Sequence, residues 1–138
     1  MPVPAAAVWD ALADPGGYGY WVVGSKAIRD ADAGWPQPGT RFHHTIGVGP
    51  LRVADHTESL QAEPGRLLRM RAKGRPLGTA EVTMRLEPRD GGTLVSMTEN
   101  PDGVHSLLAL NPLVHLLTKA RNAESLMRLE ELALRRAP

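Results

Sequence analysis

The chain has 138 residues, with 16 basic and 15 acidic side chains and a formal net charge of +1, which is the size of one domain. The charges are spread along the chain, so no basic block is present that would follow a nucleic acid backbone or a membrane surface. There is no cysteine, which excludes disulfides and cysteine-based metal sites. No apolar run approaches the roughly 20 residues of a membrane-spanning helix. We therefore expect one cytoplasmic domain, residues 1–138, without nucleic acid binding or membrane insertion; the excess of arginine over lysine indicates a bacterial source.

The N-terminal residues predict a short helix over 4–13, because Pro4 is tolerated in a first turn and Val8 and Leu12 share an apolar face. The stretch Asp14-Pro-Gly-Gly ends this helix. A glycine-rich elbow with Tyr18, Tyr20 and Trp21 follows.

Six strands are predicted after Val22, where the hydrophobic period changes to two and turn signals recur at short, regular spacing. A two-residue turn at Asp90-Gly91 places Val82 opposite Glu99, and it likewise pairs Met84 with Met97 and Leu86 with Val95. One face of the hairpin then carries the apolar side chains and the other carries polar ones. This pattern is typical of an antiparallel sheet with one buried face.

A long helix over residues 113–136 is expected to cover the buried face. Its apolar residues fall into two stripes, of which the first contains Leu113, Leu116, Leu117, Ala120 and Met127 and the second contains Leu126, Leu129 and Ala133. Two explanations are open: the helix bends within residues 118–122, or the second stripe meets a partner.

The order of these elements resembles the START-like, or SRPBCC, superfamily, and especially its polyketide cyclase/dehydrase-like bacterial members. The stretches that carry the resemblance are Val8-Trp-Asp-Ala-Leu-Ala-Asp-Pro15 with Tyr18 and Trp21, Pro38-Gly-Thr40, Gly91-Gly-Thr-Leu-Val95 and Arg121-Asn-Ala-Glu-Ser-Leu126. The resemblance implies an α+β helix-grip fold, in which a curved antiparallel sheet wraps around the long C-terminal helix and short N-terminal helices close one side. It also implies a cavity for lipids, polyketides or other apolar molecules.

The chain departs from this family at its N-terminus. The family opens with a strand ahead of the first helix, whereas only Met1-Pro-Val-Pro4 precedes the helix here. We expect either that the sequence begins late or that the sheet lacks its first strand and exposes an edge.

The predicted ligand site contains the inward-facing residues of the strands, the aromatic elbow and one face of the final helix. Its members are Tyr18, Tyr20, Trp21, Phe42, Ile46, Val53, Thr57, Met70, Val82, Met84, Met97, Glu99, Leu117, Ala120 and Glu124. The aromatic rings could instead close the core, and Glu124 could meet Arg121 or remain solvated on the helix surface.

His44 and Asp55 are the candidate catalytic residues. If Gly49-Pro50 forms the hairpin tip, His44 lies directly opposite Asp55, and a shift of one residue on each side makes the two diagonal neighbours. A carboxylate beside a histidine raises its basicity, as a general base for ring closure or dehydration requires. The alternative is a pair that satisfies its own hydrogen bonds.

Other site chemistries find little support in the sequence. The five histidines lack metal-ligand spacing, and neither a nucleophile elbow nor a cofactor motif occurs, so we expect no metal and no cofactor. Three functions remain: binding of a small apolar molecule, a cyclase or dehydratase reaction with His44 and Asp55, and an interaction module that forms a homodimer or hetero-complex through the second helix stripe.

Overall fold

The computed structural model describes residues 1–23, 25–48, 51–73, 79–102 and 112–137. Within these ranges it does not describe the side chains of residues 25–27, 29, 45–48, 51–55, 101–102 and 114–115. The helical elements are α1 (Ala5–Leu12), the 3-10 turn η1 (Pro15–Gly17), α2 (Tyr18–Trp21) and α3 (Pro112–Arg136). The strands are β1 (Ser25–Ala31), β2 (Arg41–Val48), β3 (Leu51–Glu63), β4 (Leu67–Lys73), β5 (Thr79–Arg89) and β6 (Gly92–Asp102).

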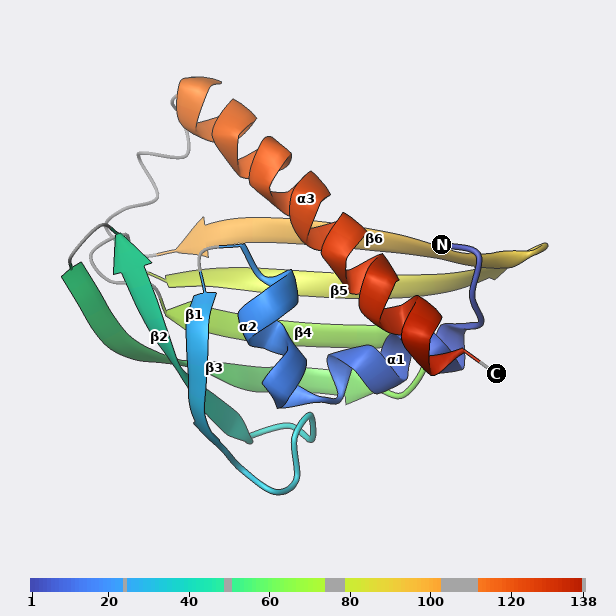
Figure 1. The fold of residues 1–138 in the computed structure, drawn as a ribbon, viewed down its shortest axis with the longest axis horizontal. Coiled ribbons are helices and arrows are strands. Elements are labelled where there is room, and N and C mark those ends of the chain that lie inside the picture. The colour runs from blue at the N-terminus through green and yellow to red at the C-terminus, as the bar shows by residue number, and fades with distance from the viewer. Residues whose placement is uncertain (24, 49–50, 74–78, 103–111, 138) are drawn as a thin grey trace.

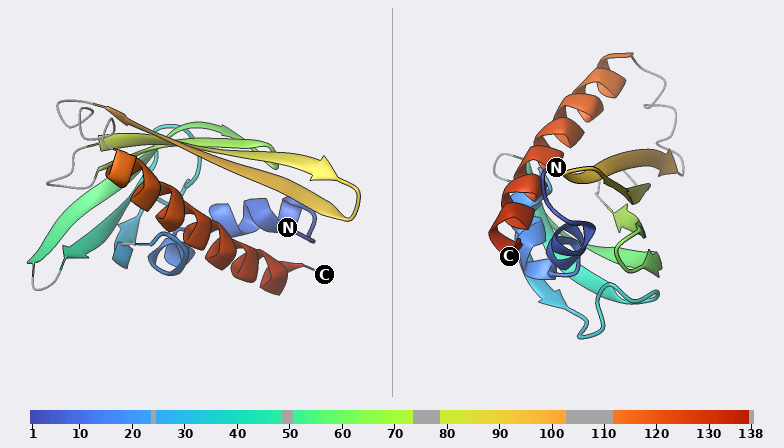
Figure 2. Two further views of the ribbon diagram at one scale, coloured as in Figure 1. Left: turned by 90° about the horizontal axis from the view of Figure 1, so that it is seen from above. Right: turned by 90° about the vertical axis from the view of Figure 1, so that its right-hand side faces the viewer.

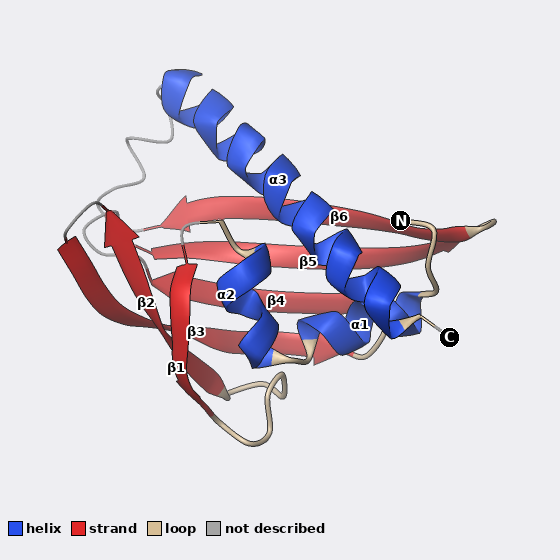
Figure 3. Ribbon diagram, in the orientation of Figure 1, coloured by secondary structure: helices blue, strands red, loops and turns tan. Residues whose placement is uncertain are grey.

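The six strands form one antiparallel sheet in the order β1-β2-β3-β4-β5-β6, so each strand pairs with its neighbour in sequence (Figure 1). The sheet curves, and all the helices lie on its concave side (Figure 2). Figure 3 shows α3 crossing the strands diagonally in front of the sheet. The predicted α+β architecture is confirmed.

The hairpins have the predicted registers. Val82 pairs with Glu99, Met84 with Met97 and Leu86 with Val95 across β5 and β6. Gly91 adopts a φ of 80° in the connecting turn, a conformation that glycine allows without steric cost. In the β2–β3 hairpin, His44 pairs with Asp55, which is the first of the two registers considered.

Tyr18 and Trp21 of the aromatic elbow belong to the buried core, whereas Tyr20 is exposed. Tyr18 and Trp21 are each 1% exposed, and the Tyr18 ring contacts those of Trp35 and Phe42 with centroid separations of 5.8 and 4.6 Å. The Tyr18 hydroxyl and the Trp35 indole N–H both donate to the Leu12 carbonyl, over 2.7 and 3.1 Å. The Leu12 carbonyl at the C-terminal end of α1 therefore accepts hydrogen bonds from two buried donors.

Helix α3 runs without interruption from Pro112 to Arg136 and packs on α1 and α2. The second apolar stripe makes this contact, because Leu129 and Ala133 are fully buried. Neither a helix break nor a partner is therefore needed to bury that stripe. The first stripe is the exposed one, with Leu113, Leu116, Leu117 and Met127 between 61% and 67% exposed.

The N-terminus lies beside the free edge of β6. The Met1 ammonium donates to the Thr93 carbonyl over 3.0 Å, and the Thr93 amide donates to the Met1 carbonyl over 2.9 Å. The Thr93 hydroxyl adds a bond to the carbonyl of Val3. Among the described residues, no helix is long and apolar enough to cross a lipid bilayer.

Candidate ligand-binding site

The concave face of the sheet has a packed half, which lies against α1 (Figure 1). Its inward side chains include Leu68, Met84 and Leu86, each at most 1% exposed. They belong to the same core cluster as Val8 and Leu12 of α1. Large apolar side chains thus fill the space between sheet and helix here, as expected of a close-packed interior.

The other part of the concave face, which we call the open half, comprises Ala72, Ala80, Met97 and Glu99. Alternation along β4, β5 and β6 turns these residues inward together with Met70, Val82 and Val95. Ala72 and Ala80 form a directly opposed pair, and all four residues of the open half are only partly buried. The opposed pair Ala72 and Ala80 is thus both smaller and less buried than the opposed pair Leu68 and Met84 of the packed half.

His44 and Thr57 provide a buried polar contact on the adjoining strands β2 and β3. The His44 Nε2 and Thr57 Oγ1 atoms are 3.1 Å apart, and both residues are buried. The imidazole ring lies 5.7 Å from the Phe42 ring, measured between centroids. Asp55 is opposite His44 in the backbone register, but its side chain is outside the described part, so the predicted carboxylate–imidazole contact stays a prediction.

An ion pair between Glu99 and Arg121 joins the open half to α3. The Glu99 side chain is 16% exposed and that of Arg121 39%. Arg121 also donates to the Asn122 side-chain oxygen over 3.4 Å. The alternation along β6 predicted that Glu99 faces inward, as the structure shows. Arg121 was considered only as a partner of Glu124. The helix phase was the missing signal, because two apolar stripes left the inward face of α3 undecided.

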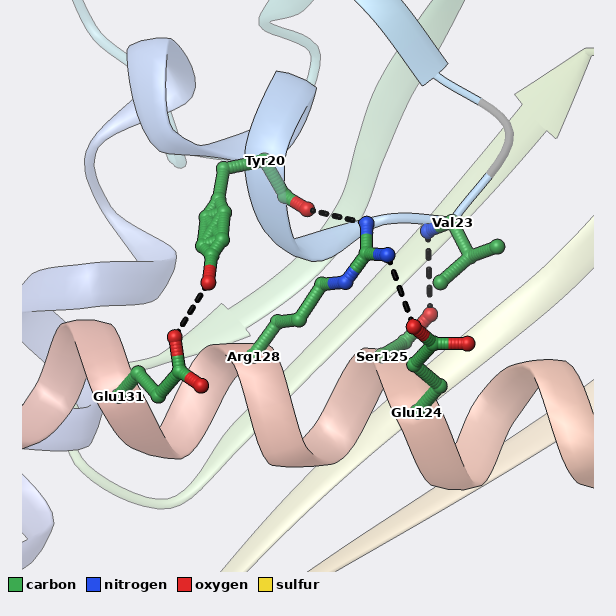
Figure 4. A network of polar contacts seen from close by, with 6 residues as sticks. All are labelled: Tyr20, Val23, Glu124, Ser125, Arg128 and Glu131. Atoms are coloured by element: carbon green, nitrogen blue, oxygen red, sulfur yellow. Dashed lines mark hydrogen bonds and ion pairs between the residues drawn. The ribbon is translucent and has the colours of Figure 1, made fainter.

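A second polar network fastens α2 to α3 at the surface (Figure 4). The Tyr20 hydroxyl donates to Glu131, and Arg128 donates to the Tyr20 carbonyl over 3.2 Å. The Arg128 guanidinium lies 5.7 Å from the centre of the Tyr20 ring, a cation–π distance. The Val23 amide donates to the Ser125 hydroxyl over 3.1 Å. Tyr20 therefore holds two helices together, and its hydrogen bond to Glu131 raises its pKa.

Several predicted ligand residues belong to the core, namely Tyr18, Trp21, Phe42, Met70, Val82 and Met84. Burial raises the pKa of Tyr18 well above its ordinary value, so its hydroxyl remains a donor. These side chains pack against one another in the hydrophobic core. Direct contact with a ligand stays a prediction for each of them, as it does for the less buried Met97.

The remaining predicted residues divide into two groups. Ile46 and Val53 are opposite each other in the β2–β3 register, and their side chains are outside the described part. Leu117, Ala120 and Glu124 are exposed on α3, and Glu124 accepts a hydrogen bond from Arg128 over 2.8 Å. Within the described ranges, no three histidine or carboxylate side chains come together to hold a metal ion.

The fold defines a class of protein in which a long C-terminal helix lies on the concave side of a curved antiparallel sheet. The chain belongs to the family described as polyketide cyclase / dehydrase and lipid transport, whose model matches residues 1–133. No curated protein matches the sequence.

Solved structures share the fold at low sequence identity. Protein NE0264 from Nitrosomonas europaea is 16% identical, with a TM-score of 0.73 over 98% of this chain and 90% of that one. Ara h 8.0201 is 19% identical, with a TM-score of 0.70 over 97% and 92%. An AHSA1-like protein from Aeromonas hydrophila is 20% identical, with a TM-score of 0.67 over 96% and 88%. A general ligand-binding role follows from the family.

Proposed function

We propose that the protein binds a small, mainly apolar, lipid- or polyketide-like molecule between α3 and the open half of the concave face. The observation that carries this proposal is the change in side-chain size along β4 and β5. Leu68 and Met84 are an inward pair that is completely buried, whereas the inward pair Ala72 and Ala80 remains partly exposed.

The residues around the open half suit a mainly apolar ligand that carries a few polar groups. Met97 offers apolar contact area, and the His44–Thr57 and Glu99–Arg121 pairs supply polar groups at the same inner face. A mostly apolar surface with a few oriented polar groups is the usual composition of a small-molecule site. The family description, which includes polyketides and lipid transport, agrees with this chemistry.

The test compares Ala80→Trp with Thr83→Trp, which adds the same ring to the outward face of β5. The probe is N-phenyl-1-naphthylamine, a neutral dye whose fluorescence rises in apolar surroundings. Ala80→Trp is expected to weaken dye binding at least about tenfold, because the indole occupies the space beside Ala72. Thr83→Trp should leave it unchanged. Melting temperatures establish that both variants fold, and equal affinity of the folded Ala80→Trp variant and the parent chain would contradict the proposal.

The second candidate function is a cyclase- or dehydratase-type reaction with His44 as general base. It is favoured by the burial of His44, by its contact with Thr57 and by the backbone register that sets Asp55 opposite. A base in such surroundings can take a proton from a substrate carbon or hydroxyl while water is excluded.

Native mass spectrometry of protein purified gently from its source tests this second function. A co-purified molecule would be released, added back and followed for conversion to a product that has lost water. The His44→Asn variant, which retains a hydrogen-bonding side chain, should bind the molecule without converting it. Conversion at the parental rate by that variant would remove His44 from the reaction.

A further inference from the structure

We infer that the Glu99–Arg121 pair selects ligands that present a neutral hydroxyl group, which deepens the binding function proposed above and rests on it. Among the ion pairs between described residues, this pair alone joins α3 to the sheet. It is also at the open half, because Glu99 is opposite the inward-facing Val82. A ligand on the open half would therefore meet these two charged groups.

The pair retains both a donor and an acceptor. A guanidinium carries five N–H donors, and both described hydrogen bonds of Arg121 start from Nη2. Nε and Nη1 make no bond to any described residue. On the other side, Glu99 accepts through Oε2, and its Oε1 atom accepts no hydrogen bond from the described part of the chain. The remaining N–H groups and the remaining oxygen are thus available together.

A hydroxyl group is the substituent that matches this arrangement, because it donates one hydrogen bond and accepts another. It can accept from Arg121 and donate to Glu99 without separating the two charges. A ketone uses only the donor, and a carboxylate brings a second negative charge beside Glu99, where repulsion opposes binding. An unsubstituted hydrocarbon leaves both groups without a new partner while removing them from water.

The experiment measures the affinity of 2-naphthol, naphthalene and 2-naphthoate, which share one ring system and differ in one substituent. For the parent chain we expect 2-naphthol to bind about tenfold more tightly than naphthalene, the usual effect of a hydrogen bond to a charged group. The 2-naphthoate anion should bind most weakly of the three. Quenching of tryptophan fluorescence or titration calorimetry gives the dissociation constants.

Arg121→Met removes the charge and keeps an unbranched side chain, so it should reduce the preference for 2-naphthol to less than about threefold. Glu99→Gln provides a second variant, which should lower the penalty on 2-naphthoate. Arg128→Met is the matched control, because Arg128 is on the same helix but bonds to Tyr20 and Glu124 at the surface. It should leave the order of the three probes unchanged, and circular dichroism checks the fold of each variant.

The outcomes separate the inference from the function on which it rests. Failure of the parent chain to bind any of the three probes would overturn both. Binding of naphthalene with equal or higher affinity than 2-naphthol would overturn the hydroxyl preference and leave apolar binding intact. Tightest binding of 2-naphthoate would do the same. A preference for 2-naphthol that persists in Arg121→Met would show that another group recognises the hydroxyl.

Discussion

The packed and open halves of the concave face are built from the same strands but differ in what covers their side chains. Leu68 and Met84 are completely buried in the core beside α1, while Ala72 and Ala80, further along the same two strands, are partly exposed. A continuous backbone ladder joins both halves. The packed half therefore stabilises the fold, and the open half is the part for which we propose ligand binding.

Helix α3 shows the same division along its length. Its C-terminal half buries Leu129 and Ala133 against the core, whereas Leu113 and Leu117 in its N-terminal half are 62% and 61% exposed. An α-helix has about 3.6 residues per turn, so Leu113 and Leu117 lie on a different side of α3 from Leu129 and Ala133.

The largest expected effect comes from placing a charge in the buried stripe of α3, compared with a charge in its exposed stripe. Leu129→Asp puts a carboxylate into the apolar core and should lower the free energy of unfolding by more than about 4 kcal/mol. Leu117→Asp alters an exposed position and should change it by less than about 0.5 kcal/mol. Urea denaturation measures both values. Similar losses for the two variants would show that the N-terminal half of α3 is buried in solution.

A smaller effect is expected from shortening an opposed pair of methionines. Met84→Ala creates a cavity in the packed half and should cost about 2–5 kcal/mol of unfolding free energy. Met97→Ala is directly opposite and partly exposed, so it should cost less than about 1.5 kcal/mol.

Thermal melts of the two variants report the difference, which follows from the exposed fraction of each side chain. If Met97→Ala costs as much as Met84→Ala, then the edge strand β6 is as tightly covered as β5. The division of the concave face would then have to be drawn elsewhere.

The smallest expected effect concerns the contact that holds α2 on α3. The hydrogen bond to Glu131 raises the Tyr20 pKa above its ordinary value of 10.0, so the folded chain holds the phenol proton more tightly than the unfolded chain. This contribution to stability is complete below the unfolded pKa and disappears as the pH rises through the folded pKa. The urea midpoint should therefore fall as the pH is raised above about 10.

Tyr20→Phe is the control for this pH dependence, because it removes the titrating hydroxyl and keeps the ring beside Arg128. The fall in the urea midpoint should be shallower in this variant. An identical fall in both chains would assign the whole alkaline loss to other groups, with the buried Tyr18 as the first candidate, since burial raises its pKa.

Much of the sheet could be predicted from the sequence, because hairpin registers depend on residues that are close along the chain. The Asp90-Gly91 turn and the alternation of β5 and β6 are sufficient to pair Val82 with Glu99. The β2–β3 hairpin was ambiguous by one residue on each side, and the structure selected the register in which His44 is opposite Asp55. The family resemblance likewise follows from the order of local elements.

The sequence by itself therefore determined the strands, the long helix and the register of the β5–β6 hairpin. Only the tertiary structure decided which stripe of α3 is buried, that Tyr18 and Trp21 close the core, and that Arg121 meets Glu99. The physical reason is the range of the interactions. Strand pairing repeats a local pattern with a period of two, whereas the rotation of α3 depends on how its two apolar stripes compete for contact with α1 and α2, which precede it by some 100 residues.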